Sequence, residues 1–119
     1  MTAAEETVRL AYEAVRRGDV VGLLNACAAD VEWRLCGPTA CARAGREGVA
    51  EWLLEVEPHL PDVRFTPSRI LEAGSEVVVV GFAEERDRAT GRWAGRERVH
   101  LWRLAAGKVA RVVEYDATV

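Results

Sequence analysis

The sequence predicts an α+β fold in which helices come first and a sheet follows. In the first half of the chain, apolar residues recur mainly at the three- and four-residue spacing of amphipathic helices. The second half consists of long β-prone runs, and the turns between these runs are too short for crossover connections. With 119 residues, 50% of them hydrophobic, the chain can build one core, so we expect a single domain over residues 1–119.

The N-terminal segment predicts a helical hairpin. Thr2 and Glu5 have the spacing of a capping box, so the first helix begins after Thr2, and Gly18 follows its last basic residues as a C-cap. Asp19 then caps a short second helix that runs as far as Asp30. The positions of the first helix that recur at helical spacing are Val8, Ala11, Tyr12 and Val15, and Tyr12 is expected to point inward.

One strand and a third helix come next. Residues 31–35 alternate between apolar and charged side chains, which predicts a strand with one buried face that stops at Gly37 and Pro38. Residues 46–57 predict a helix that packs on the sheet and ends at Pro58. The side chains expected to face the core are Val31, Trp33 and Leu35 on the strand and Val49, Trp52, Leu53 and Val56 on the helix.

Four β-prone runs fill the remainder of the chain, at residues 63–71, 76–85, 92–104 and 109–115. Three short turns that each contain a glycine separate the runs, so we expect antiparallel hairpins. Pro67 lies inside the first run and indicates an edge strand or a bulge. Together these signals predict a strongly bent antiparallel sheet that wraps around the three N-terminal helices.

Composition excludes several classes of function. The formal net charge of -3 provides no field for nucleic acid. No apolar run approaches the ~20 residues of a membrane helix, and acidic residues occupy the N-terminal region where a secretion signal is basic. We therefore expect a cytoplasmic protein. The three cysteines, Cys27, Cys36 and Cys41, lack the spacing of a zinc site, so we expect free thiols, no metal and no cofactor.

The chain resembles the SnoaL-like polyketide cyclases of the NTF2-like superfamily, which also contains ketosteroid isomerase and limonene epoxide hydrolase. The resemblance spans nearly the whole chain, and the order and spacing of its motifs are more specific than any single one. The motifs are Tyr12-Glu13-Ala14, Arg17-Gly18-Asp19, Asp30-Val31-Glu32-Trp33, Gly45-Arg46-Glu47-Gly48-Val49, His100-Leu101-Trp102-Arg103-Leu104, Gly107-Lys108-Val109 and Glu114-Tyr115.

This resemblance implies a cone-shaped α+β barrel whose open end encloses an apolar pocket, in a homodimer formed through the sheet. Val99 and Leu101 would lie on the outer face that such a dimer covers. The superfamily includes isomerases, cyclases, epoxide hydrolases and non-catalytic binding proteins, so the pocket residues must decide the function. The alignment places Leu35 where ketosteroid isomerase has its base, His100 at its oxyanion-hole aspartate and Ala11 at its tyrosine. The steroid isomerase mechanism therefore does not transfer.

The residues that can carry chemistry lie on the last two strands. If alternation continues without a bulge, Arg96, Arg98, His100, Trp102 and Leu104 share the face that, by the resemblance, lines the pocket. Glu114 matches a catalytic acid position of the epoxide hydrolase branch, and Asp116 competes with it for that role. His100 and Glu114 are the expected catalytic pair. The expected substrate contacts are Tyr12, Trp33, Leu35, Trp52, Arg98, Trp102 and Val112.

Structural interpretations of the same residues remain open. His100 and Glu114 can form a buried structural pair, and Arg96 and Arg98 can belong to a solvated rim. The tryptophans Trp33, Trp52 and Trp102 are also ordinary core residues.

The leading prediction is a cofactor-free, metal-free enzyme that uses proton transfer to isomerise, cyclise or hydrolyse an apolar, polyketide-like molecule. The alternative is a non-catalytic ligand-binding or dimeric scaffold protein of the same fold. Epoxide hydrolysis is a third possibility, which lacks an obvious second aspartate in the pocket. The sequence contains no phosphate-binding loop, zinc-protease motif or nucleophile elbow.

Overall fold

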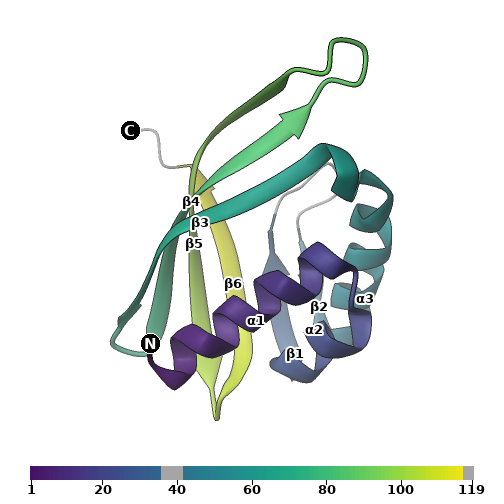
Figure 1. Cartoon of the computed structure of the whole chain (residues 1–119). Coiled ribbons are helices and arrows are strands. Elements are labelled where there is room, and N and C mark those ends of the chain that lie inside the picture. Colours follow the sequence, from purple (N-terminus) through teal and green to yellow (C-terminus); the bar gives the residue numbers. More distant parts are fainter. Residues whose placement is uncertain (36–41, 117–119) are drawn as a thin grey trace.

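The structure is a computed structural model that describes residues 1–35 and 42–116. Its helices lie against one side of a curled six-stranded sheet, and the hairpin between two long strands projects beyond this body (Figure 1). The arrangement confirms the predicted α+β class. None of the helices in the described ranges is long and apolar enough to cross a membrane.

Helix α1 spans Ala3–Arg17 and has both hydrogen bonds of the predicted capping box between Thr2 and Glu5. Gly18 ends the helix at φ 64°, a left-handed conformation that glycine adopts without strain. Asp19 caps helix α2, Val20–Ala26, by accepting a hydrogen bond from the Gly22 amide at 2.9 Å. The hairpin of helices is therefore confirmed.

The prediction that the second helix continues to Asp30 is wrong. Strand β1, Cys27–Arg34, begins directly after α2. Cys27 pairs with Val109 of the last strand, and this long-range backbone pairing outweighs the helix-compatible local sequence. Val31, Trp33 and Leu35 face the core as predicted.

Helix α3, Gly45–Val56, packs on β1 and buries the four predicted apolar residues. It does not stop at a loop: a 3-10 helix, η1, continues over Glu57–Asp62. Pro58 ends the α-helix yet fits the start of η1, where its missing N–H leaves no unpaired donor. The predicted stop of the first strand at Gly37 and Pro38 lies outside the described residues.

The sheet has the strand order β2-β1-β6-β5-β4-β3. The three predicted hairpins are confirmed, because β3, β4, β5 and β6 pair antiparallel in sequence. The sheet is nevertheless mixed, because β1 runs parallel to β6, a pairing that no local turn indicates. The remaining strands span Arg43–Ala44 (β2), Val63–Ala73 (β3), Glu76–Arg86 (β4), Trp93–Ala105 (β5) and Lys108–Asp116 (β6).

Pro67 meets both expectations, since it lies on the edge strand β3 and next to a register shift between Pro67 and Arg69.

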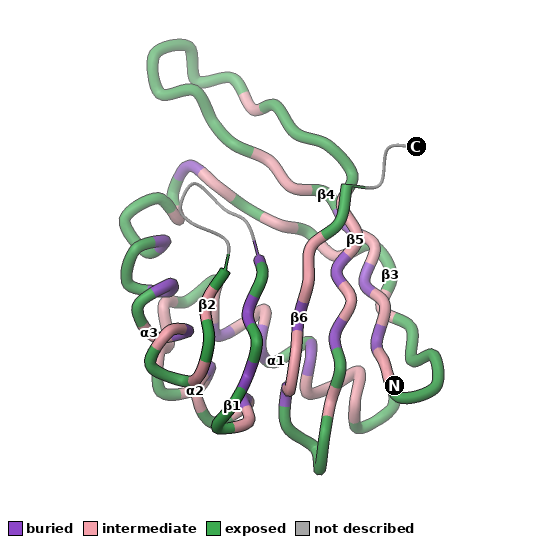
Figure 2. The backbone as a smooth tube through the Cα atoms, turned by 180° about the vertical axis from the view of Figure 1, so that it is seen from behind, coloured by how far each residue is buried: buried purple, intermediate pink, exposed green. Residues whose placement is uncertain are grey.

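The core lies between the helices and the inner face of the sheet, where the buried backbone positions concentrate in Figure 2. α1 packs against β3, β4 and β6, and α3 packs against β1. Trp33 and Trp102 are the largest fully buried side chains. The projecting β4–β5 hairpin is mainly exposed (Figure 2), so its position depends on contacts at its root rather than on the core.

Candidate functional site

The register of strands β5 and β6 places His100 opposite Glu114. The side chains are 3% and 6% exposed, and His100 Nε2 lies 2.7 Å from Glu114 Oε2. The expected alternation holds from Arg96 to Trp102, and a register shift follows between Arg103 and Leu104. Two strands therefore present a histidine and a carboxylate to the same side of the sheet, as the sequence predicts.

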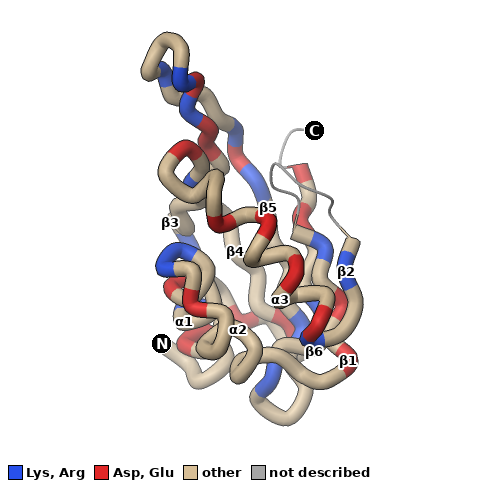
Figure 3. The backbone as a smooth tube through the Cα atoms, turned by 90° about the vertical axis from the view of Figure 1, so that its right-hand side faces the viewer, with Lys and Arg blue, Asp and Glu red and all other residues tan. Residues whose placement is uncertain are grey.

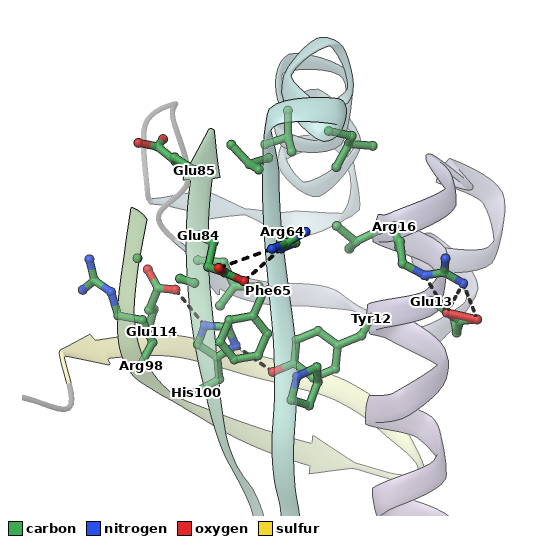
Figure 4. Close-up of a pocket in the computed structure, with 18 of the residues that line it drawn as sticks. Tyr12, Glu13, Arg16, Arg64, Phe65, Glu84, Glu85, Arg98, His100 and Glu114 are labelled. Atoms are coloured by element: carbon green, nitrogen blue, oxygen red, sulfur yellow. Dashed lines mark hydrogen bonds and ion pairs between the residues drawn. The ribbon is translucent and has the colours of Figure 1, made fainter. Parts of the chain in front are cut away.

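Tyr12 from α1 completes a line of hydrogen bonds with this pair (Figure 4). Its hydroxyl lies 2.6 Å from His100 Nδ1, and the Trp102 indole N–H donates to the same hydroxyl at 2.9 Å. We call Tyr12, His100, Trp102 and Glu114 the buried tetrad. Residues up to 102 positions apart in the sequence thus meet in one hydrogen-bonded group.

One arrangement of protons satisfies every hydrogen bond of the tetrad. The Trp102 N–H can only donate, so Tyr12 Oη accepts from it, and the Tyr12 hydroxyl proton can then be donated to a neutral His100 at Nδ1. His100 is then protonated on Nε2 and donates to the Glu114 carboxylate. Burial raises the pKa of Tyr12 far above its usual range, so its hydroxyl stays protonated as this order requires.

Phe65 on β3 covers one face of His100, with ring centroids 4.1 Å apart and an angle of 22° between the rings. The contact crosses strand β4 at Gly81, where an added Cβ would lie 2.4 Å from the Phe65 ring. Sequence reasoning missed Phe65. The alternation of residues 63–67 could have placed it on the inner face, but no sequence pattern indicates its reach over Gly81.

The tetrad borders a pocket of about 990 Å³, which lies among α1, α3, η1 and strands β3–β6. Trp33 and Val112 do not line it, and both side chains are fully buried in the core. Of the expected site residues, the structure brings seven together on its wall: Tyr12, Leu35, Trp52, Arg98, His100, Trp102 and Glu114.

Trp33 packs edge-on against Trp52 and Trp102, with ring centroids 5.2 and 5.7 Å apart. This packing supports the pocket wall from behind.

A second polar group lies where the β4–β5 hairpin leaves the body. Arg64 pairs with Glu84 at 2.9 Å and its guanidinium covers the Trp93 ring at 3.9 Å. Asp62 accepts hydrogen bonds from Arg86 and Arg88, which lower the pKa of its carboxyl group. We call Asp62, Arg64, Glu84, Arg86 and Trp93 the hairpin cluster. Figure 3 shows this mixture of acidic and basic positions along the hairpin.

Asp116, the competitor of Glu114, lies two residues further along β6 and opposite Arg98. Its side chain is 43% exposed and lies 3.3 Å from Arg96 and 3.9 Å from Arg98. Of these two carboxylates, Glu114 is the more buried, lines the pocket and is bound to His100.

Cys27 is a free, buried thiol, and burial raises its pKa to about 11, which leaves it unreactive near neutral pH. Cys36 and Cys41 lie outside the described residues. Within residues 1–35 and 42–116, no group of three or more His, Cys, Asp and Glu side chains is arranged to hold a metal ion.

Comparison with known proteins assigns the chain to a family. The model of the SnoaL-like domain matches residues 8–112, which include the tetrad residues Tyr12, His100 and Trp102. The chain belongs to the SnoaL-like domain family. No curated protein sequence matches it.

Solved structures place this SnoaL-like domain among NTF2-like proteins. An NTF2-like protein of unknown function from Burkholderia pseudomallei is 29% identical, with a TM-score of 0.81 over 98% of this chain and 92% of that one. TerC, co-crystallised with polyporic acid, is 28% identical, with a TM-score of 0.80 over 97% and 92%. An NTF2-like protein from Burkholderia xenovorans is 30% identical, with a TM-score of 0.76 over 95% and 88%. The predicted family and fold are confirmed.

Proposed function

We propose that this SnoaL-like domain is an enzyme that performs cofactor-free proton transfer on a small apolar molecule bound in the pocket. The observation that carries the proposal is the buried tetrad: a carboxylate, 6% exposed, held by a histidine at the wall of a pocket of about 990 Å³. A pocket of this size lies within the range of pockets that bind drug-sized organic molecules.

Within the pair, Glu114 is the group that exchanges the proton with the substrate. Both nitrogens of His100 are already used, one by Tyr12 and one by Glu114. Glu114 Oε1 receives no hydrogen bond from the described residues, so this oxygen is available to a substrate proton. His100 holds the carboxylate in place and stabilises its charge, which makes it a positioning residue.

The neighbour TerC supports a small-molecule ligand, because it was crystallised with polyporic acid. We carry over only this class: a small organic molecule. Isomerisation, cyclisation and enolisation each need one group that accepts a proton and returns it, and Glu114 can serve all three.

A test of the proton-transfer step uses 5-nitrobenzisoxazole, a small aromatic probe that opens when a base removes its ring C–H proton. The electron pair forms the nitrile, the N–O bond breaks, and a coloured phenolate is released while the base keeps the proton. We expect turnover by the wild-type protein and a loss of about a hundredfold in Glu114→Gln.

Glu85 provides the matched control, because this glutamate also lines the pocket but is exposed. Glu85→Gln should leave the rate unchanged. Equal rates for wild type and Glu114→Gln, with both proteins folded, would overturn the proposal.

The alternative is a ligand-binding protein in which the tetrad is structural. It is favoured by one observation, the complete internal use of both His100 nitrogens. It predicts that polyporic acid binds without conversion and that Glu114→Gln changes stability but not reactivity.

The homodimer stays a prediction. The outer face of the sheet supports it, because apolar side chains of β4, β5 and β6 lie next to one another there. Light scattering at micromolar concentration should give twice the mass of the chain, and a monomer mass would contradict the prediction. The residues of this face are Val78, Val80, Phe82, Val99, Leu101, Val113 and Tyr115.

A further inference from the structure

Arg98 has weaker hydrogen-bond and ion-pair partners within the protein than Arg64 and Arg16, two other arginines at the pocket. Arg64 is bound by Glu84 at 2.9 Å and Arg16 by Glu13 at 2.7 Å. The Nε atom of Arg98 is buried and has no hydrogen-bond partner in residues 1–35 and 42–116. Its guanidinium Nη1 lies 3.9 Å from Asp116, at the limit of an ion pair. Arg98 therefore retains unused donors.

The position of Arg98 places its guanidinium group at the pocket. It lies two residues from His100 on the same face of β5, lines the pocket, and appears beside Glu114 in Figure 4. Its side chain is 26% exposed, whereas that of Arg96, the next residue on this face, is 62% exposed. A guanidinium that is partly withdrawn from water binds an anion more strongly than one on the open surface.

We propose that Arg98 binds an oxyanion of the ligand, so that the pocket takes an apolar molecule with one carboxylate or enolate oxygen. This inference rests on the proposed function, because it treats the pocket as a small-molecule site. The guanidinium fork suits such a group, since two N–H donors can meet one carboxylate or one enolate oxygen. The apolar body of the ligand would contact apolar lining residues of the pocket such as Trp52, Val56, Leu60 and Ile70.

The pair of Arg98 and Glu114 is then suited to enolisation. Glu114 removes a proton from the carbon next to a carbonyl group, the electron pair of the C–H bond moves into the carbonyl, and the oxygen becomes negative. Arg98 donates hydrogen bonds to that oxygen as the charge develops. Where a further carbon–carbon double bond is conjugated with the enolate, Glu114 returns the proton to the far carbon of that double bond, the double bond shifts, and the substrate is isomerised.

The test compares two probes of nearly equal shape, 2-naphthoate and the neutral 2-naphthamide, by isothermal titration calorimetry. The wild-type protein should bind the anion about tenfold more tightly, because charge-assisted hydrogen bonds are the strong ones. Arg98→Met should abolish this preference and leave amide binding unchanged. Arg98→Lys, which keeps the charge without the fork, should retain part of it.

Arg96→Met is the matched control, because Arg96 lies on the same face and also reaches Asp116. It should keep the preference. Glu114→Gln should tighten naphthoate binding, because it removes a like charge from the wall. A preference that survives in Arg98→Met, equal binding of the two probes by wild type, or binding of neither would overturn the inference.

The ring opening of 5-nitrobenzisoxazole distinguishes a failure of the Arg98 inference from a failure of the proposed proton transfer. If Glu114-dependent opening of 5-nitrobenzisoxazole persists while the preference for the anion is absent, the role of Arg98 is wrong and proton transfer stands. If the preference depends on Arg98 but Glu114→Gln leaves the opening rate unchanged, the protein is an anion-binding member of the family.

Discussion

The buried tetrad and the hairpin cluster are built from similar residues but differ in how far their tryptophans and their donor groups are buried. Each contains a tryptophan, an acidic residue and a group that donates to that acid. The two acids are similarly buried, since the side chains of Glu114 and Asp62 are 6% and 11% exposed, but Trp102 is fully buried whereas Trp93 is half-buried. The donor His100 is 3% exposed, whereas the donor Arg86 is 40% exposed. We therefore expect burial, more than residue type, to decide what each contact contributes to the free energy of unfolding.

Substitution of Trp102 and of Trp93 should give the largest difference in the free energy of unfolding between the two clusters. Trp102→Ala removes a fully buried ring and the donor to Tyr12, so it should cost about 3–5 kcal/mol of the free energy of unfolding. Trp93→Ala removes a half-buried ring and one cation–π contact, so it should cost about 1 kcal/mol or less. Urea denaturation measures both. Equal losses would mean that the hairpin is part of the cooperative core.

The next effect separates burial from pairing at His100. His100→Leu leaves the Glu114 carboxylate buried without its donor and should cost about 3 kcal/mol. The double variant His100→Leu, Glu114→Leu replaces the pair by apolar side chains and should recover part of that loss. Urea denaturation of both variants measures the difference. A double variant less stable than the single one would show that the pair stabilises the fold directly.

A smaller effect is expected where the edge strand meets the tetrad. Gly81→Ala adds a methyl group that would lie 2.4 Å from the Phe65 ring and 2.7 Å from the Thr66 carbonyl oxygen. The variant should lose about 1–3 kcal/mol and displace Phe65 from His100. Urea denaturation and a crystal structure check these two results, and an unmoved Phe65 would contradict the second.

The smallest effect is the pH dependence of the hairpin cluster. Hydrogen bonds from Arg86 and Arg88 lower the pKa of Asp62 in the folded state, so its stabilisation is present above the unfolded pKa of about 4 and is lost as pH falls. Asp62→Asn should therefore be less stable at pH 7 and lose less stability between pH 5 and 3. Urea midpoints at several pH values measure this. An unchanged acid slope would contradict it.

The sequence predicts the hairpins well, because their signals are local. Capping at Thr2 and Asp19 and the alternation around each glycine turn are confirmed. The end of α2 and the parallel pairing of β1 with β6 depend on residues about 80 positions apart, as between Cys27 and Val109. Local propensity contains no information on such a contact, so the strand was predicted four residues too late.

The same division applies to the site. His100 opposite Glu114 follows from strand register alone, and Tyr12 follows from helical spacing as an inward residue. Two contacts of His100 do not follow from local patterns: the hydrogen bond with Tyr12 and the stacking of Phe65 on its ring. Both depend on how α1 and β3 lie relative to the sheet. Trp33 has the same alternation pattern as a pocket residue but is enclosed by other rings.

The indole N–H of Trp102 helps to hold the side chains of the site in one arrangement before a ligand binds. The Trp102 N–H can only donate, so Tyr12 Oη accepts at this end of the line and the Tyr12 hydroxyl cannot donate back to Trp102. The orientation of three side chains is thus settled during folding, and an arriving ligand meets dipoles that need no rearrangement. Preorganisation of this kind removes an entropic and solvent cost from the reaction and transfers it to the stability of the protein.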